Sequence, residues 1–150
     1  MPLDKPPVRA LRPEDFEKAR PIFAVWEITL KCDQPCAHCG SRAGDKRARE
    51  LTTEECFKVA DSIARLGCRE VALVGGEAYL RQDVGDIVEH LAGLGLRVGI
   101  QTGGRAFTKE RARDMKARGL TMLGVSVDGP ARVHDKLRGN LGSHAAAMSA

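Results

Sequence analysis

The stretch EVALVGGEAYLRQDVGDIVEHLAGLGLRVGIQ, residues 70–101, decides the fold class. Residues 70–75 are mostly apolar and run into two glycines, a pattern typical of a short buried strand. Residues 83–93 then carry apolar side chains at helical spacing: Val84, Ile87, Val88 and Leu91. A second apolar run follows at residues 96–101. Strand, helix and strand in this order predict two parallel strands joined by a crossover helix.

The same alternation continues toward the N-terminus. Residues 22–30 (IFAVWEITL) are rich in β-branched and aromatic residues and predict a first strand. After a long loop, a helix begins at Thr52, where the pattern Thr52-x-x-Glu55 forms a capping box, and it ends at Gly67. This strand and helix form a complete unit ahead of residues 70–101.

Toward the C-terminus, a helix that Thr108 can cap precedes a fourth apolar strand at residues 120–127 (LTMLGVSV). The turn at residues 128–130 ends that strand, and the segment HAAAMSA predicts another helix. Four such units imply an α/β fold with a parallel sheet, either doubly wound or arranged as a barrel. No further strand follows that could close a barrel, so we expect a fragment or a truncated product.

Polar and glycine-rich segments follow the carboxyl ends of all four predicted strands. In chain order they are the cysteine loop after residue 30 and the segments 75–77 (GGE), 101–104 (QTGG) and 126–128 (SVD). Loops at this end of the strands carry the chemistry in both barrels and doubly wound sheets. We therefore expect these four segments to converge on one site.

Size and composition restrict the class of protein. The 150 residues are 43% hydrophobic and only 4% aromatic, which predicts one domain with an aliphatic core. The net charge of +4 arises from basic residues interleaved with acidic ones, a pattern that does not favour a nucleic-acid partner. No run approaches a membrane span, and the proline-rich start lacks a signal peptide's apolar region, so we expect a cytoplasmic protein. Residues 1–21 predict an extended lead-in, and residues 22–150 the domain itself.

Three of the five cysteines fall within eight residues: Cys32, Cys36 and Cys39. An odd count with this crowding indicates a metal site in a reducing compartment rather than disulfides. Zinc would need a fourth ligand, and the nearest candidate, His38, is adjacent to Cys39. A cubane iron–sulfur cluster has four irons, so three cysteines leave one iron open to a small molecule. We favour the cluster, and we expect Cys56 and Cys68 to be buried and inert.

The cysteine loop lies in the sequence WEITLKCDQPCAHCGSRAG, residues 26–44. This sequence resembles the signature of the radical S-adenosylmethionine (SAM) superfamily, Cys-x3-Cys-x2-Cys after a first strand. The resemblance implies a partial (βα)6 TIM-like barrel, of which this chain covers about the first four βα units. It also implies a [4Fe–4S] cluster on the three cysteines, with SAM chelating the open iron. One electron from the cluster would cleave SAM to a 5′-deoxyadenosyl radical, which abstracts hydrogen from a substrate.

The resemblance further implies a set of residues that bind SAM: Gly75, Gly76, Glu77, Gln101, Thr102, Ser126, Asp128 and Arg138. Glu77 would hold the ammonium group of the cofactor, and the two glycines before it permit close approach of the backbone. Ser126 and Asp128 would contact the ribose hydroxyls or the carboxylate, and Arg138 would bind the methionine carboxylate. His38 lies where the family has a side chain near the adenine, and we expect it to pack there rather than to ligate metal.

The segment VSVDGPARVHDKLRG, residues 125–139, is similar to a segment of the subgroup that carries a SPASM or twitch extension. That subgroup implies peptide or cofactor maturation, a peptide or small-molecule substrate, and an electron donor such as flavodoxin or ferredoxin. A radical methylating or RNA-modifying enzyme is a weaker alternative, because neither Cys56 nor Cys68 is well placed as a second reactive cysteine. From another class, the chain could be a non-catalytic iron–sulfur or zinc binding module, or an inactive fragment.

Overall fold

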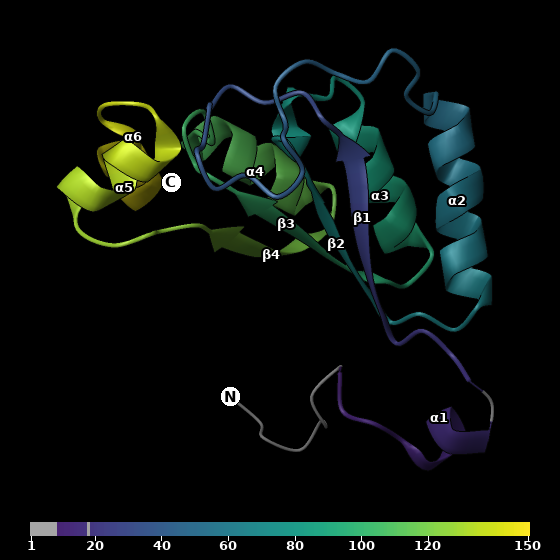
Figure 1. The fold of residues 1–150 in the computed structure, drawn as a ribbon. Coiled ribbons are helices and arrows are strands. Elements are labelled where there is room, and N and C mark those ends of the chain that lie inside the picture. The colour runs from purple at the N-terminus through teal and green to yellow at the C-terminus, as the bar shows by residue number, and fades with distance from the viewer. Residues whose placement is uncertain (1–8, 18) are drawn as a thin grey trace.

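The computed structural model describes residues 9–17 and 19–150, and its centre is a parallel four-stranded sheet (Figure 1). The strands are β1 (Phe23–Thr29), β2 (Glu70–Gly75), β3 (Arg97–Thr102) and β4 (Leu120–Val125). Each strand pairs with the next one along the chain, in the order β1-β2-β3-β4. A doubly wound sheet reverses its strand order, so this order selects the partial barrel between the two architectures that the sequence leaves open. The sequence predicts each strand to within two residues at either end.

Three helices connect the strands and lie on one side of the sheet: α2 (Thr53–Arg65), α3 (Val84–Gly93) and α4 (Lys109–Ala117) (Figure 1). The capping box at the start of α2 is confirmed. Thr52 Oγ1 accepts a hydrogen bond from Glu55 N at 3.2 Å, and Thr52 N donates to the Glu55 carboxylate at 2.9 Å. The residues predicted to face inward from α3 are all buried in the aliphatic core: Val84, Ile87, Val88 and Leu91.

The N-terminal lead-in differs from the predicted extended segment. It contains a short helix, α1 (Pro13–Glu17), while residues 1–8 of the predicted lead-in lie outside the described residues. Proline suits the first helical position, and Asp15 accepts a hydrogen bond from Arg12 N at 2.8 Å. Asp15 also pairs with Arg69, next to the start of β2, at 3.0 Å. Because this ion pair joins residues 54 apart in the chain, local sequence patterns do not reveal it.

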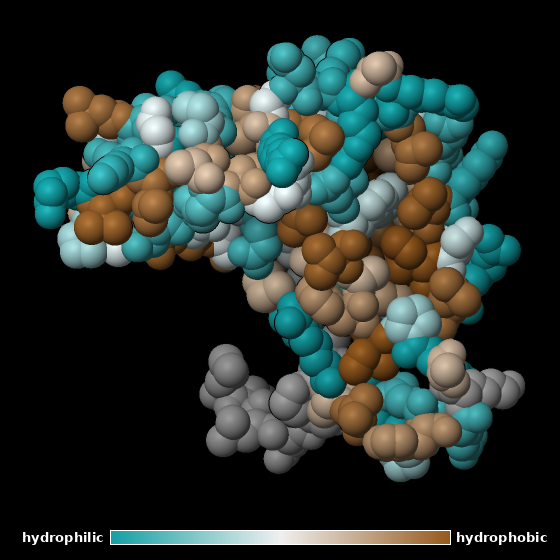
Figure 2. Space-filling model, in the orientation of Figure 1, coloured by the Kyte–Doolittle hydropathy of each residue, from teal (hydrophilic) through white to brown (hydrophobic). Residues whose placement is uncertain are grey.

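Beyond β4 the chain forms α5 (Ala131–Arg138) and α6 (Ser143–Ser149), the second of which is the predicted HAAAMSA helix. A single 3-10 turn, η1 (Ala78–Leu80), follows β2 and is not apparent in the sequence. Strands β1 and β4 are the two edges of the sheet, and Val25 on β1 is 62% exposed. Figure 2 shows apolar side chains over the middle of the molecule, on the side from which β1 is seen in Figure 1. No helix in the described part of the chain is long and apolar enough to span a membrane.

Candidate cluster and cofactor site

The loops that follow the four strands meet in one cavity of about 350 Å³. Every predicted site residue except Asp128 lines it: Cys32, Cys36, Cys39, Gly75, Gly76, Glu77, Gln101, Thr102, Ser126 and Arg138. The convergence follows from the parallel sheet, because the carboxyl ends of its strands lie at the same edge. The prediction that the four loops meet is confirmed, while the role of each residue stays a prediction.

The cysteine loop is closed at its base by two backbone hydrogen bonds. Cys32 N donates to Gly44 O at 2.8 Å, and Gly44 N donates to Leu30 O at 3.0 Å. The middle of the loop is held from another direction, where Ala37 N donates to the Leu137 carbonyl of α5 at 2.8 Å. Bonds at its own base and one bond from the distant helix α5 therefore fix the loop that presents the three cysteines.

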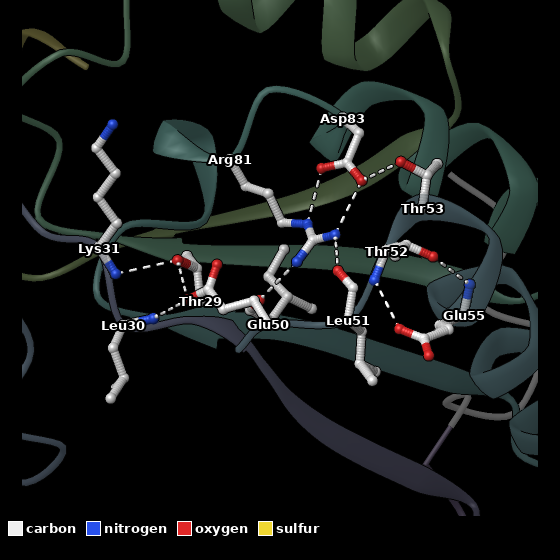
Figure 3. A network of polar contacts seen from close by, with 11 residues as sticks. Thr29, Leu30, Lys31, Glu50, Leu51, Thr52, Thr53, Glu55, Arg81 and Asp83 are labelled. Atoms are coloured by element: carbon white, nitrogen blue, oxygen red, sulfur yellow. Dashed lines mark hydrogen bonds and ion pairs between the residues drawn. The ribbon is translucent and has the colours of Figure 1, made fainter. Parts of the chain in front are cut away.

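The far end of the same loop is anchored by Glu50 and Arg81 (Figure 3). The Glu50 carboxylate accepts hydrogen bonds from Thr29 Oγ1 at 2.9 Å and from Leu30 N at 3.1 Å. Arg81 donates to the Leu51 carbonyl at 2.7 Å. These side chains connect the end of β1, the returning loop and the segment after η1. The sequence analysis did not identify them, because each acts through partners that are distant in the chain.

Backbone N–H groups face two of the three cysteine sulfurs. Gln34 N lies 3.4 Å from Cys32 Sγ, and Ala43 N lies 3.3 Å from Cys39 Sγ. Hydrogen bonds to sulfur are among the features that set the potential of an iron–sulfur cluster. Burial raises the pKa of the Cys32 and Cys36 thiols, and metal binding, which takes up the thiolate form, would oppose this shift.

Within residues 9–17 and 19–150, no three Cys, His, Asp or Glu side chains are close enough to ligate a single metal ion. A tetrahedral zinc site needs four ligands at about 2.0–2.3 Å from one ion. A cubane cluster binds each thiolate at a different iron, so its ligands need not converge on one point. Three cysteine thiolates are one ligand short of a closed tetrahedral zinc site, whereas they leave one iron of a cubane cluster open, so this donor set fits a cluster better than a structural zinc ion.

Gly75 and Gly76 allow the chain after β2 to lie against the end of β1. A Cβ atom would lie 2.1 Å from Thr29 O if added at Gly75, and 2.2 Å from Lys31 O if added at Gly76. Gly75 also has a φ of +144°, a value that L side chains rarely adopt. Gly76 N and Glu77 N donate to Thr29 O and Lys31 O at 2.9 and 2.8 Å. The two glycines thus permit a close approach between the backbone after β2 and the backbone after β1.

Glu77 is the buried carboxyl group of the cavity, with 3% of its surface exposed. Its two oxygens accept hydrogen bonds from Thr102 Oγ1 and Gly103 N, both at 2.6 Å. Burial raises the pKa of Glu77, and these two hydrogen bonds oppose that shift. Among the described residues, no Lys, Arg or His side chain forms an ion pair with Glu77. A buried carboxylate of this kind suits a ligand that brings a positive charge.

Asp128 and Arg138 form a bidentate pair at the edge of the cavity. Arg138 Nε lies 2.6 Å from Asp128 Oδ2, and Nη2 lies 3.0 Å from Oδ1. The hydrogen bond from Arg138 lowers the pKa of Asp128. Arg138 Nη1 lies 4.0 Å from Cys36 Sγ, so Asp128, which does not line the cavity, orients a guanidinium group that does. His38 lines the cavity with an exposed side chain, and its Nε2 lies 3.6 Å from Asp128.

Gln101 and Ser126 occupy adjoining positions at the ends of β3 and β4. A Cβ atom added at Gly124 would lie 2.1 Å from Gln101 Oε1, so this glycine leaves room for the glutamine side chain. Ser126 N donates to Thr102 O at 2.9 Å, which ties the two strand ends together. Both side chains therefore reach the same cavity.

Six further residues line the cavity that the sequence analysis did not assign to the site: Gln34, Ser41, Gly40, Ala43, Val74 and Gly103. The first four lie in the cysteine loop, where position alone does not show which residues turn inward. The expectation that Cys56 and Cys68 are buried is confirmed, because both lie in the hydrophobic core, while their lack of reactivity stays a prediction.

Comparison with known proteins agrees with this geometry. The sequence profile of the radical SAM superfamily matches residues 26–150. Fe-coproporphyrin III synthase of Methanosarcina barkeri is 34% identical over 134 residues, which are 89% of this chain and 34% of that protein. Mycofactocin maturase MftC of Mycolicibacterium smegmatis is 34% identical over 129 residues, which are 84% of this chain and 33% of that protein. The chain thus spans about a third of the length of these relatives.

Solved structures share the fold. Streptococcus suis SuiB, in a crystal structure with bound S-adenosylmethionine, superposes with a TM-score of 0.71 at 16% identity, covering 84% of this chain and 30% of SuiB. BtrN, in complex with AdoMet and 2-DOIA, superposes with a TM-score of 0.59 at 18% identity, covering 86% of this chain and 55% of BtrN. The family profile covers β1 from Trp26 onward, the other three strands, the cysteine loop and every residue of the cavity. The chain therefore belongs to the radical SAM superfamily, and this membership implies a [4Fe–4S] cluster and SAM as its cofactors.

Proposed function

We propose that this chain is part of a radical SAM enzyme in which Cys32, Cys36 and Cys39 hold the cluster and the adjoining cavity binds SAM. The observation that carries the proposal is that the three cysteines and the buried Glu77 line one cavity. When bound, the cluster supplies the electron for reductive cleavage of SAM, which yields a 5′-deoxyadenosyl radical that abstracts hydrogen from the substrate.

We expect charged residues of the cavity to bind the oppositely charged groups of SAM. Glu77 accepts the ammonium group, because each of its oxygens uses one lone pair within the protein and keeps another for a ligand. Arg138, held by Asp128, offers Nη1 toward the methionine carboxylate. Ser126 and Gln101 supply polar contacts to the rest of the cofactor.

The substrate class is a peptide or a cofactor precursor. The relatives support this assignment, since one is named a mycofactocin maturase and another an Fe-coproporphyrin III synthase. SuiB, with the same fold, has been crystallised with its precursor peptide SuiA. These names do not favour a non-catalytic binding module or an inactive fragment. The burial of Cys56 and Cys68 in the core likewise gives no support to a mechanism that needs a second reactive cysteine.

An acidic electron donor such as flavodoxin or ferredoxin would reduce the cluster. A second cavity, of about 670 Å³, adjoins the base of the cysteine loop, and it is lined by the exposed basic side chains of Lys31, Lys46 and Arg49 and by one exposed acidic side chain, Glu54. Opposite charges on two partners increase their rate of encounter, so these basic groups suit an acidic donor. We also propose a cytoplasmic location, because the cluster ligands must stay reduced and all five cysteines are free.

The test is SAM cleavage by the full-length protein after anaerobic reconstitution, with dithionite as reductant and chromatographic detection of 5′-deoxyadenosine. Wild type and Cys56→Ala, which removes a core cysteine outside the cavity, should form the product. Cys36→Ala should form none and should contain less iron and sulfide. A wild-type protein that assembles its cluster but forms no 5′-deoxyadenosine would refute the proposed reaction, and full iron content in Cys36→Ala would refute the ligand assignment.

A further inference from the structure

Gln34 lies in the cysteine loop, and the NH₂ group (Nε2) of its buried side-chain amide has no hydrogen-bond partner among the described residues. The residue is 4% exposed and lines the cavity. Burying an amide N–H group without an acceptor is unfavourable, and the few unsatisfied groups in folded proteins call for an explanation. An acceptor that binds in the cavity would provide one.

The surroundings of Gln34 indicate which acceptor that is. Its backbone N–H is directed at Cys32 Sγ at 3.4 Å, and its side-chain Oε1 lies 3.9 Å from Cys36 Sγ. One residue therefore borders two of the three sulfurs that the cluster would use. Rotating the amide by 180° would exchange Nε2 and Oε1 and direct the NH₂ group at Cys36 Sγ. After this rotation the amide donor lies beside a cluster ligand, whereas before it Nε2 lies beside Gly103, 2.6 Å from the position of a Cβ atom added there.

We propose that the Gln34 amide donates a hydrogen bond to a sulfur of the cluster, either a cysteine thiolate or an inorganic sulfide, and so raises the reduction potential of the cluster. This inference rests on the proposed function, because it requires a cluster on these cysteines. Thiolate and sulfide bound to iron carry negative charge and no proton, so they only accept hydrogen bonds. Reduction adds an electron, and a donor at sulfur stabilises the more negative state.

The experiment is a redox titration of the reconstituted full-length protein without SAM, followed by electron paramagnetic resonance of the reduced cluster. Gln34→Met keeps the length of the side chain and removes the donor, whereas Gln34→Glu keeps the shape and replaces the donor with an acceptor. Both should shift the midpoint potential to more negative values, and Gln34→Glu should shift it further. Gln82→Met, which changes an exposed glutamine outside the cavity, should leave the potential unchanged.

If fully loaded Gln34→Met and Gln34→Glu have the midpoint potential of wild type, the proposal is overturned. This holds even if both variants bind SAM more weakly, because that result would mean that the amide donates to SAM and not to the cluster. If Gln34→Met binds less iron, Gln34→Asn decides the matter. Retained iron in Gln34→Asn, which keeps an amide donor, would support the proposal, and equal loss would assign Gln34 to packing and overturn it. Failure of the proposed function looks different, because it is seen in the wild-type protein as a missing cluster or missing SAM cleavage.

Discussion

Replacing Glu77 with glutamine removes the negative charge of the cavity while keeping the shape of the side chain. The fold should tolerate this change. Glutamine Oε1 can still accept from Gly103 N, and the Thr102 hydroxyl, which now donates to Glu77, can rotate and accept from the new NH₂ group. The substitution should therefore weaken the binding of SAM rather than the stability of the fold. A hydrogen bond to a charged group contributes about 1.5–3 kcal/mol, so the Kd for SAM should rise about 10- to 150-fold.

The assay is equilibrium binding of SAM to the anaerobic, cluster-loaded protein, with iron content measured on the same samples. Glu54→Gln is the matched control, because Glu54 is exposed at the start of α2 and does not line the cavity. Its Kd should equal that of wild type. A Glu77→Gln protein with full iron content and a Kd within about twofold of wild type would refute the role of Glu77 as the ammonium acceptor.

The same variant should change how stability depends on pH. Because burial raises the pKa of Glu77, the folded protein binds this proton more tightly than the unfolded chain does. The free energy of unfolding should therefore fall as the pH rises from the ordinary pKa of glutamate through the raised folded value. Urea denaturation of the cluster-free protein across this range should show the decrease in wild type and a flatter profile in Glu77→Gln. An identical slope in both proteins would mean that Glu77 does not titrate in a buried setting.

Three further substitutions test the support of the site. Gly76→Ala should lower the melting temperature and the iron content, because its Cβ would lie 2.2 Å from Lys31 O. Gly93→Ala, whose added Cβ in α3 would meet nothing within 4 Å and which lies outside the cavity, should lower neither. Asp128→Asn should weaken the anchoring of Arg138 and reduce the free energy of unfolding by about 1.5–3 kcal/mol, measured with urea. Thr52→Ala removes the capping box of α2 and should cost about 1 kcal/mol in the same assay without affecting SAM affinity. Unchanged stability in either of the last two variants would contradict the hydrogen bonds described here.

Much of the fold follows from patterns that are local in the sequence. The spacing of Val84, Ile87, Val88 and Leu91 specifies both α3 and its buried face. The order of the strands is not local, since doubly wound sheets and barrels share the same alternation of elements. Helix α1 also escapes prediction, because its Asp15 is held by Arg69 on a distant part of the chain. What the sequence leaves open is decided by contacts between segments far apart.

The site divides in the same way. The cysteine spacing and the positions of the loops after the strands are visible in the sequence, so the gathering of Cys32, Cys36 and Cys39 beside Glu77 was predictable. The orientation of side chains was not. The ion pair between Asp128 and Arg138 depends on how α5 packs, and nothing in the sequence of the cysteine loop distinguishes Gln34 from its neighbours.

The measurement that tests the central claim most directly is electron paramagnetic resonance of the reduced, cluster-loaded protein before and after addition of SAM. If the three cysteines leave one iron open toward the cavity of Glu77, SAM should change the spectrum, and it should do so only at higher concentration in Glu77→Gln. A spectrum that saturating SAM leaves unaltered would contradict the claim that this cavity brings SAM to the cluster.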